Sequence, residues 1–364
     1  MVLDFAKEAV QNSATHSINF DELRAGKANI KVVGCGGCGC NMTTWLFNKG
    51  VQGATVYAAN TDALHLSVSK ADDKLLIGKE LTRGLGAGGV PQKGREAAKE
   101  ALVDIKKAVG GADMVFVLAG MGGGTGTGSA PVVAQIAKET GAVVIGVVTM
   151  PFEAEKARID KAEFGLQELR EVTDTCIVLD NNRLVDIAGQ LPIEQAFAVA
   201  NELVSTMIKG IVETITLPSL INLDYADVSA IMKDGGVAVI GIGESDSSSN
   251  KVDEAVKQAL THPLLDVDYK GATGALIHIT CGPDLKLEEF DIIGRTVSES
   301  LSSDANVIIG ARISKEFAGK VRVITIMTGV KSPYVLGRDR DDFMRGGHKA
   351  PAKEISDLGI EVWR

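Results

Sequence analysis

The feature that most constrains this chain is a glycine-rich stretch at residues 120–129, GMGGGTGTGS. It follows an apolar run, 114–119, that predicts a buried parallel strand, and it precedes a segment at Pro131 whose apolar spacing predicts the start of a helix. Glycines let backbone N–H groups approach a ligand closely, and a helix N-terminus favours negative charge. Thr125 and Thr127 add hydroxyl donors. Five glycines and two threonines within seven residues exceed what a flexible turn needs, so we interpret the stretch as a phosphate-binding loop.

The bulk composition limits the other classes of protein. A chain of 364 residues is long enough for two domains, and 45% hydrophobic with 23% charged residues is typical of a globular protein. The net charge of −9 argues against broad nucleic-acid binding, so we expect no nucleic-acid partner. The apolar runs are strand-length, and no basic segment followed by an apolar core opens the chain. We therefore expect a cytoplasmic protein without direct membrane insertion.

Three of the five cysteines crowd into residues 35–40, CGGCGC. This spacing is compatible with a metal or redox site, but a zinc or iron–sulfur site requires four ligands. Cys176 and Cys281 are single and distant in the sequence. We favour the interpretation that the cysteines replace glycine or other small residues in a tight loop, and no disulfide is implied.

Two further glycine loops follow strand-like segments. Residues 34–39 follow the strand predicted at 31–33 and match the dinucleotide pattern G-x-G-x-x-G, with a helix expected over 41–48. A nicotinamide enzyme is therefore one alternative. The other loop, 84–91, precedes a charged helix expected over about 91–108. One pyrophosphate requires one such loop, whereas three loops at one sheet edge suit a longer phosphate chain, and the sequence contains no Walker G-K-[ST].

The remaining chain predicts a doubly wound, mostly parallel α/β sheet, a long central helix and a smaller α+β domain. Apolar residues at helical spacing over 192–215 predict the long helix, which ends at Leu217-Pro218. The predicted units are an N-terminal extension, a nucleotide-binding domain, the central connecting helix, a C-terminal domain and a mobile tail, at residues 1–27, 28–190, 191–217, 218–330 and 331–364. In the C-terminal domain we expect strands at 236–242, 272–280, 306–313 and 321–327.

Asp224 and Asp227 lie three residues apart at the start of a helix expected after Asn222. Two acids at such a place are commonly capping groups and solvated charge. Spacing alone does not separate that role from a catalytic one.

Taken together, these motifs resemble the FtsZ-type cell-division GTPases of the tubulin superfamily, in particular the archaeal ones. Residues 122–128, GGGTGTG, match the family signature. The similarity extends over about 28–330 through NTDA, GLGAG, ADMVF, TMPF, NLDYADV and PLLD at residues 60–63, 84–88, 112–116, 149–152, 222–228 and 263–266.

The resemblance implies a GTP site, with GTP or GDP as the bound nucleotide and Mg²⁺ as its cation, for which Asp62 is a possible ligand. It places phosphate contacts at Gly36, Gly37, Cys38, Gly39, Asn41, Ala87, Gly88, Gly89, Gly123, Gly124, Thr125, Gly126 and Thr127. Glu155 and Arg158 would contact the ribose, although the family spaces this pair one residue further apart. Asn181, Phe197 and Asn201 would bind guanine, while Phe197 alone also fits plain core packing.

The resemblance further implies that Asp224, Asp227 and Asn222 act on the GTP of a neighbouring subunit. The chain would then be a GTPase that polymerises head-to-tail with itself into a division ring at midcell. An alternative is a tubulin-like filament that controls cell shape without constricting. A membrane-anchoring adaptor and other division proteins are expected partners, with the tail or its ending at 360–363 as the docking segment.

Overall fold

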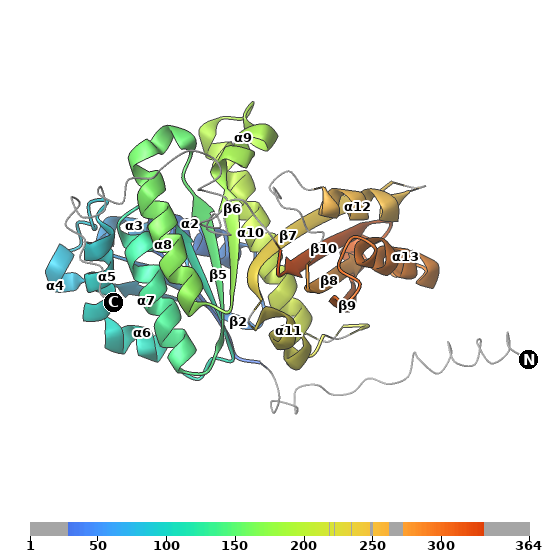
Figure 1. Cartoon of the computed structure of the whole chain (residues 1–364), viewed down its shortest axis with the longest axis horizontal. Coiled ribbons are helices and arrows are strands. Elements are labelled where there is room, and N and C mark those ends of the chain that lie inside the picture. Colours follow the sequence, from blue (N-terminus) through green and yellow to red (C-terminus); the bar gives the residue numbers. More distant parts are fainter. Residues whose placement is uncertain are drawn as a thin grey trace, which may run out of the picture.

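The computed structural model describes residues 28–217, 219–221, 223–233, 235–247, 250–261 and 272–330. A ten-stranded sheet with helices on both faces runs through this part of the chain (Figure 1). Its order is β3-β2-β1-β4-β5-β6-β7-β10-β8-β9. The strands are β1 (Ile30–Cys35), β2 (Ala54–Asn60), β3 (Asp73–Leu76), β4 (Met114–Gly120), β5 (Val143–Met150), β6 (Thr175–Asp180), β7 (Gly236–Ser245), β8 (Gly274–Cys281), β9 (Asn306–Ile313) and β10 (Val321–Thr328).

Strands β1 to β6 run parallel to their neighbours, as predicted for the first part of the chain, and β7 runs parallel to β6. β4 and β5 are buried along nearly their whole length, which explains their continuous apolar sequences. Alternate residues of β4 contribute to two different cores, with Phe116 and Leu118 in one and Val115 and Val117 in the other. The parallel sheet is therefore covered on both faces.

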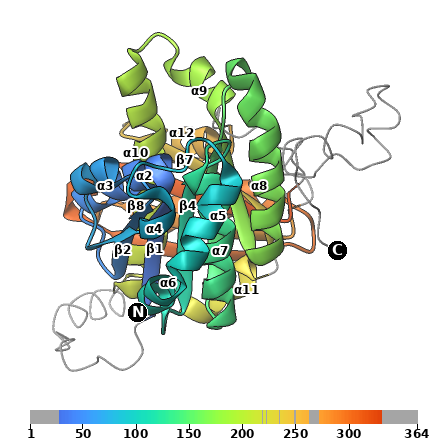
Figure 2. The same cartoon turned by 90° about the vertical axis from the view of Figure 1, so that its left-hand side faces the viewer.

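The helices of this part divide between the two faces. α2 and α10 pack on one face, and α5 to α8 pack on the other (Figure 2). The elements are α2 (Gly36–Asn48), α3 (Ala63–Val68), α4 (Lys79–Thr82), α5 (Pro91–Glu100), α6 (Leu102–Val109), α7 (Thr125–Glu139), the 3₁₀ helix η2 (Glu153–Arg158), α8 (Ile159–Val172), α9 (Asn181–Ala188) and α10 (Ile193–Thr216).

The C-terminal part continues the same sheet. β7 pairs with β6, and β10 runs antiparallel to both β7 and β8. Its other elements are α11 (Tyr225–Met232), α12 (Lys251–Leu260), α13 (Leu287–Ser298) and the 3₁₀ helix η3 (Lys315–Phe317). α12 and α13 form their own core with the sheet, whereas α10 packs on its other face and shares a core with residues of both parts. The four expected strands and the long central helix are confirmed.

Two predicted helix starts were wrong. α7 begins at Thr125 rather than near Pro131, and α2 begins at Gly36 rather than near Asn41. Glycine and threonine are weak helix formers, so propensity alone places these residues in loops. Packing on the sheet supplies the stabilisation that propensity lacks, and the loop residues become first helical turns. The predicted helix over 91–108 is interrupted at Ala101.

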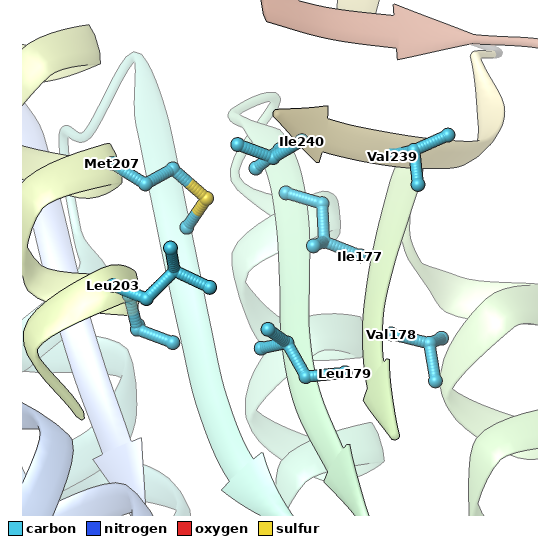
Figure 3. Close-up of a pocket in the computed structure, with 8 residues that line it drawn as sticks. Ile177, Val178, Leu179, Leu203, Met207, Val239 and Ile240 are labelled. Carbon is cyan, nitrogen blue, oxygen red and sulfur yellow. The ribbon is translucent and has the colours of Figure 1, made fainter. Parts of the chain in front are cut away.

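α10 leaves a small cavity where it crosses the junction of β6 and β7. The cavity is about 20 Å³ and apolar, and Leu203 and Met207 of α10 face Ile177 and Ile240 across it (Figure 3).

Several predictions fall on residues that the structure does not describe, namely those on the N-terminal extension, Asn222, residues 263–266 and the tail from 331 onward. Within the described ranges, no helix combines the length and the apolar character needed to cross a membrane.

Candidate functional site

The strand order reverses between β1 and β4. β2 and β3 extend the sheet to one side of this pair, while β5 and β6 extend it to the other. In doubly wound sheets, ligands bind beyond the carboxyl ends of the strands at such a reversal. Residues 34–39 and 120–128 end these two strands, so the first and third glycine loops meet at this point.

Glycines allow these two loops to touch. Gly36 has a φ of +71°, and a Cβ placed there would lie 2.6 Å from the amide nitrogen of Gly126. A Cβ on Gly126 would lie 2.8 Å from the carbonyl oxygen of Gly120 and 3.0 Å from that of Cys35. The loops are packed backbone to backbone, and a side chain at either position would separate them.

The second loop lies against the third. Val90 N–H donates to the Ala87 carbonyl at 3.2 Å, and Gly88 and Gly89 have φ of +61° and +73°, the pattern of a type I′ turn. A Cβ on Gly124 would approach the Ala87 Cβ to 2.9 Å and the Gly89 nitrogen to 3.1 Å. The Lys161 ammonium donates to the Gly89 carbonyl at 2.9 Å. Lys161 comes from α8, and no motif in the sequence pointed to it.

The convergence of the loops brings two helix N-termini together. Gly36 to Gly39 form the first turn of α2, and Thr125 to Thr127 lie in the first turn of α7. Neither N-cap residue makes a side-chain capping hydrogen bond. First-turn N–H groups lack partners within the helix, so two such turns side by side can bind an anion. Asn41 lies further along α2 and is exposed.

The two threonines of the signature differ. The Thr125 hydroxyl lies 2.6 Å from that of Thr61, a residue at the end of β2 that was not predicted to contribute. Thr127 is only 1% exposed, and its methyl group packs against Gly165 of α8, where an added Cβ would lie only 2.3 Å from it. Its hydroxyl has no hydrogen-bond partner among the described residues. The Thr127 side chain therefore faces the interior, whereas the sequence predicted its hydroxyl as a phosphate donor.

The cysteines behave as small packing residues. Burial raises the pKa of the Cys35 and Cys40 thiols to about 12, so both are neutral. Cys38 lies between the first loop and β5, with its Sγ 3.4 Å from the Thr149 hydroxyl, and burial raises its pKa as well. Within the described ranges, no group of three or more histidine, cysteine or acidic side chains is arranged to hold a metal ion.

Glu155 and Arg158 lie on the 3₁₀ helix η2, where residues three apart eclipse each other. Their side chains form an ion pair at 2.6 Å. The shorter spacing of the pair is therefore accommodated by the tighter helix. A Cβ on Gly122 would lie 2.8 Å from the Arg158 carbonyl, which places η2 against the signature loop.

Aromatic and amide side chains lie beside η2. Phe197 of α10 contacts Phe152 edge-to-face, with ring centroids 6.0 Å apart, and remains partly exposed. Asn201 lies one turn further along α10, and Asn181 begins α9. Asn182 accepts from the Glu153 N–H and donates to Asp180, which fixes the start of α9 next to η2. Phe152 and Asn182 were missed, although both follow strands that end at this edge.

Asp224 and Asp227 lie away from the glycine loops. Asp224 is the N-cap of α11 without a side-chain capping bond, Asp227 lies in its first turn, and both are exposed. The segment is anchored on both sides of residue 222: Ile221 pairs with Ala311 of β9, and Leu223 is buried. The Tyr225 hydroxyl donates to the Asp113 carbonyl at 2.7 Å.

That hydrogen bond locates the acids relative to the glycine loops. Asp113 directly precedes β4, whereas the signature loop follows it. β4 has seven residues, and at about 3.3 Å per residue its ends lie about 20 Å apart. Accordingly, α9 and α11 lie at opposite ends of α10 (Figure 1). The structure brings the phosphate-loop residues together but does not bring the acids to them.

Fold and site together define an α/β protein whose glycine loops and two helix N-termini, with no Walker loop, meet beyond the carboxyl ends of its parallel strands, where proteins of this class bind nucleotides. Residues 29–189 match the GTPase domain of the tubulin/FtsZ family, and residues 236–331 match the C-terminal domain of the FtsZ family.

Individual relatives agree with these matches. Cell division protein FtsZ 2 of Methanocaldococcus jannaschii is 54% identical over 341 residues, covering 93% of this chain and 89% of that protein. FtsZ 2 of Halobacterium salinarum is 57% identical over 330 residues, covering 91% of this chain and 83% of that protein. The solved structure of an empty FtsZ dimer of M. jannaschii superimposes with a TM-score of 0.80 at 50% identity, over 89% of this chain and 92% of that one. The chain belongs to the FtsZ family, and its N-terminal part is the family's GTPase domain.

Proposed function

We propose that this protein forms head-to-tail filaments in which Asp224 and Asp227 of one subunit complete the GTP site of the next. The observation that carries this proposal is that the acids lie at the amino end of β4, whereas the glycine loops lie at the carboxyl ends of the strands. A carboxylate about 20 Å away cannot orient a water molecule at a phosphate in its own subunit. It can do so for the phosphate of a neighbouring subunit that stacks end to end on the first.

Within one subunit, the loops supply the binding half of the site. The first turns of α2 and α7 hold the phosphate chain, and the turn at Ala87, Gly88 and Gly89 encloses the terminal phosphate. Glu155 and Arg158 flank the ribose. Asn181, Phe197 and Asn201 bind guanine, with the exposed face of Phe197 as the stacking surface. We assign these roles to a GTP-binding unit over 28–190.

The neighbouring subunit supplies the water-orienting half. Exposed carboxylates accept hydrogen bonds, so Asp224 and Asp227, together with Asn222, align the attacking water with the terminal phosphate. Phosphoryl transfer is catalysed mainly by positioning and charge stabilisation, so such an aligning group is chemically sufficient. We assign this activating role to residues 218–330, joined to the binding unit through the helix at 191–217.

Exposed apolar side chains support the same head-to-tail contact between subunits. Ile193 (74% exposed) and Leu191 lie near the base-binding end, while Leu220 (68% exposed) and Ile313 lie near the acids. A contact between two different patches does not close on itself and generates open filaments. Burying these side chains against the next subunit would stabilise the polymer.

Mg²⁺ is the expected counterion of the phosphate chain, because it binds phosphate oxygens together with one or two carboxylates. Asp62 fits this role, since it lies at the end of β2 among the glycine loops. One of its oxygens accepts from the His65 N–H, and in this proposal the other binds the ion or its water. Bound Mg²⁺ would offset phosphate charge.

In the cell, we propose a division filament in the cytoplasm that assembles at midcell and is tethered by a separate membrane adaptor and other division proteins. Relatives that are 50–57% identical carry the name cell division protein FtsZ, which favours division over the alternative role in cell shape. The GTPase-domain match likewise displaces the nicotinamide-enzyme alternative.

The substitution Asp227→Ala tests whether Asp227 acts on the GTP of a neighbouring subunit. The variant should bind GTP and sediment as filaments but lose most of its hydrolysis, because only the water-orienting group is removed. Full turnover in its filaments would contradict the proposal.

A mixing experiment sharpens this test. Gly123→Asp places a carboxylate at the phosphate loop and should abolish nucleotide binding through charge repulsion, while its acidic segment stays intact. Each variant should be inactive alone, and a mixture should hydrolyse GTP because one supplies the nucleotide and the other the acids. A mixture that stays inactive, although the variants bind each other, would contradict completion in trans.

A further inference from the structure

His65 of α3 lies beside the first phosphate loop. A Cβ placed on Gly37 would have one neighbour within 4 Å, the Nε2 of His65 at 3.9 Å. Gly37 is exposed and lies in the first turn of α2, whereas His65 is half-buried. The imidazole edge that carries Nε2 therefore faces the place where an anion would meet α2.

The other ring nitrogen is occupied within the protein. Asn60 accepts hydrogen bonds through its Oδ1 from the N–H groups of Thr61 at 2.9 Å and Asp62 at 3.3 Å. These bonds turn its amide nitrogen toward His65 Nδ1, at 3.4 Å. Ser69 also lies 3.5 Å from Nδ1, but its hydroxyl donates to the His65 carbonyl at 2.8 Å.

The contacts of Nδ1 bear on the imidazole tautomer. The amide nitrogen of Asn60, at 3.4 Å, can only donate, so a hydrogen on Nδ1 would point at its hydrogens, whereas the Ser69 oxygen at 3.5 Å could accept one. The nearer contact, with Asn60, favours an unprotonated Nδ1 with the hydrogen on Nε2. In that tautomer the edge facing Gly37 is a hydrogen-bond donor.

We propose that His65 Nε2–H donates to a phosphate oxygen of the nucleotide bound at the N-terminus of α2. The inference rests on the proposed nucleotide site and adds a side-chain ligand to it. The three glycine loops at 34–39, 84–90 and 120–129 contain no lysine or arginine. A donor from α3 therefore complements backbone N–H groups in loops that carry no positively charged side chain.

Three substitutions separate this role from a structural one. His65→Leu removes both ring nitrogens. His65→Gln carries an amide nitrogen at the reach of Nε2, whereas His65→Asn reaches only the position of Nδ1 and keeps the contact with Asn60. Equilibrium binding of GDP and GTP is measured on full-length protein below its assembly concentration, with thermal unfolding of the nucleotide-free proteins as the fold control.

A phosphate contact predicts that His65→Leu and His65→Asn each weaken nucleotide binding about tenfold, the scale of one hydrogen bond to a charged group, and that His65→Gln binds like the wild-type protein. A purely structural role predicts the reverse order, in which His65→Asn keeps the affinity of the wild-type protein and His65→Gln loses it, and that order would overturn the inference. Equal affinity in all four proteins would overturn it as well. Failure of the wild-type protein to bind GDP or GTP would instead overturn the proposed function itself.

Discussion

Glycines in the phosphate loops serve two purposes that the sequence alone does not separate. At Gly36 and Gly126 the missing Cβ permits backbone contact between two loops. A Cβ placed on Gly123 would meet no atom within 4 Å, and its φ is not positive, so its free side faces open space. The density of glycine predicted the anion site, but only tertiary contacts distinguish glycines that shape the protein from those that face a ligand.

We expect Gly126→Ala and Gly123→Ala to have different effects. The first puts a Cβ within 2.8 Å and 3.0 Å of two backbone oxygens and should lower the free energy of unfolding by about 1–3 kcal/mol. The second should change it by less than about 0.5 kcal/mol yet weaken GDP binding, because the methyl group occupies ligand space. Urea unfolding without nucleotide and a binding titration measure the two effects. Normal GDP binding by Gly123→Ala would show that its open side does not face the nucleotide.

At the scale of elements, periodicity predicted the long segments and missed the short ones. α10 and the four strands of the C-terminal part follow from apolar spacing, because their buried faces are long enough to produce a clear period. β3, α3 and α4 have six residues or fewer and were not predicted. α3 carries His65, so the shortest elements contribute to the site without a signal in the sequence.

The contact between α10 and β8 predicts a dependence of stability on pH. His278 of β8 is 4% exposed, and it lies 2.7 Å from the Thr214 hydroxyl of α10 through Nδ1 and 3.0 Å from the Thr280 hydroxyl through Nε2. Burial, with smaller contributions from Arg312 and Arg322, lowers its pKa from 6.5 to about 4. The native state therefore keeps this histidine neutral where the unfolded chain protonates it.

Because the unfolded state binds the extra proton between these two pKa values, stability falls as the pH is lowered through this window. From about pH 7.5 to about pH 5, His278 should cost about 2 kcal/mol of the free energy of unfolding. Urea unfolding of the GDP-bound protein at both pH values checks this. His278→Gln should show a smaller loss, and equal losses in the variant and the wild-type protein would contradict the assignment.

At the scale of the whole molecule, the sequence indicated two units but not their union in one sheet. The pairing of β6 with β7 joins segments about sixty residues apart, and neither strand's own pattern specifies its neighbour. The hydrogen bond from Tyr225 to Asp113 places the acids at the amino end of β4, whereas the signature loop follows its carboxyl end. The resemblance to the family implied catalysis between subunits, and the single-chain geometry gives the physical reason for it.

A site divided between subunits makes hydrolysis depend on assembly. GTP turnover per subunit should rise steeply above a threshold protein concentration, because below it each nucleotide lacks the acids of a neighbour. Hydrolysis and sedimentation are measured on the same samples, with Asp227→Ala as the matched control that should pellet without turnover. If the wild-type rate per subunit stays flat across concentrations at which no polymer sediments, each monomer carries its own catalytic group. Asp224 and Asp227, held about 20 Å from the loops by the length of β4, could not then be that group.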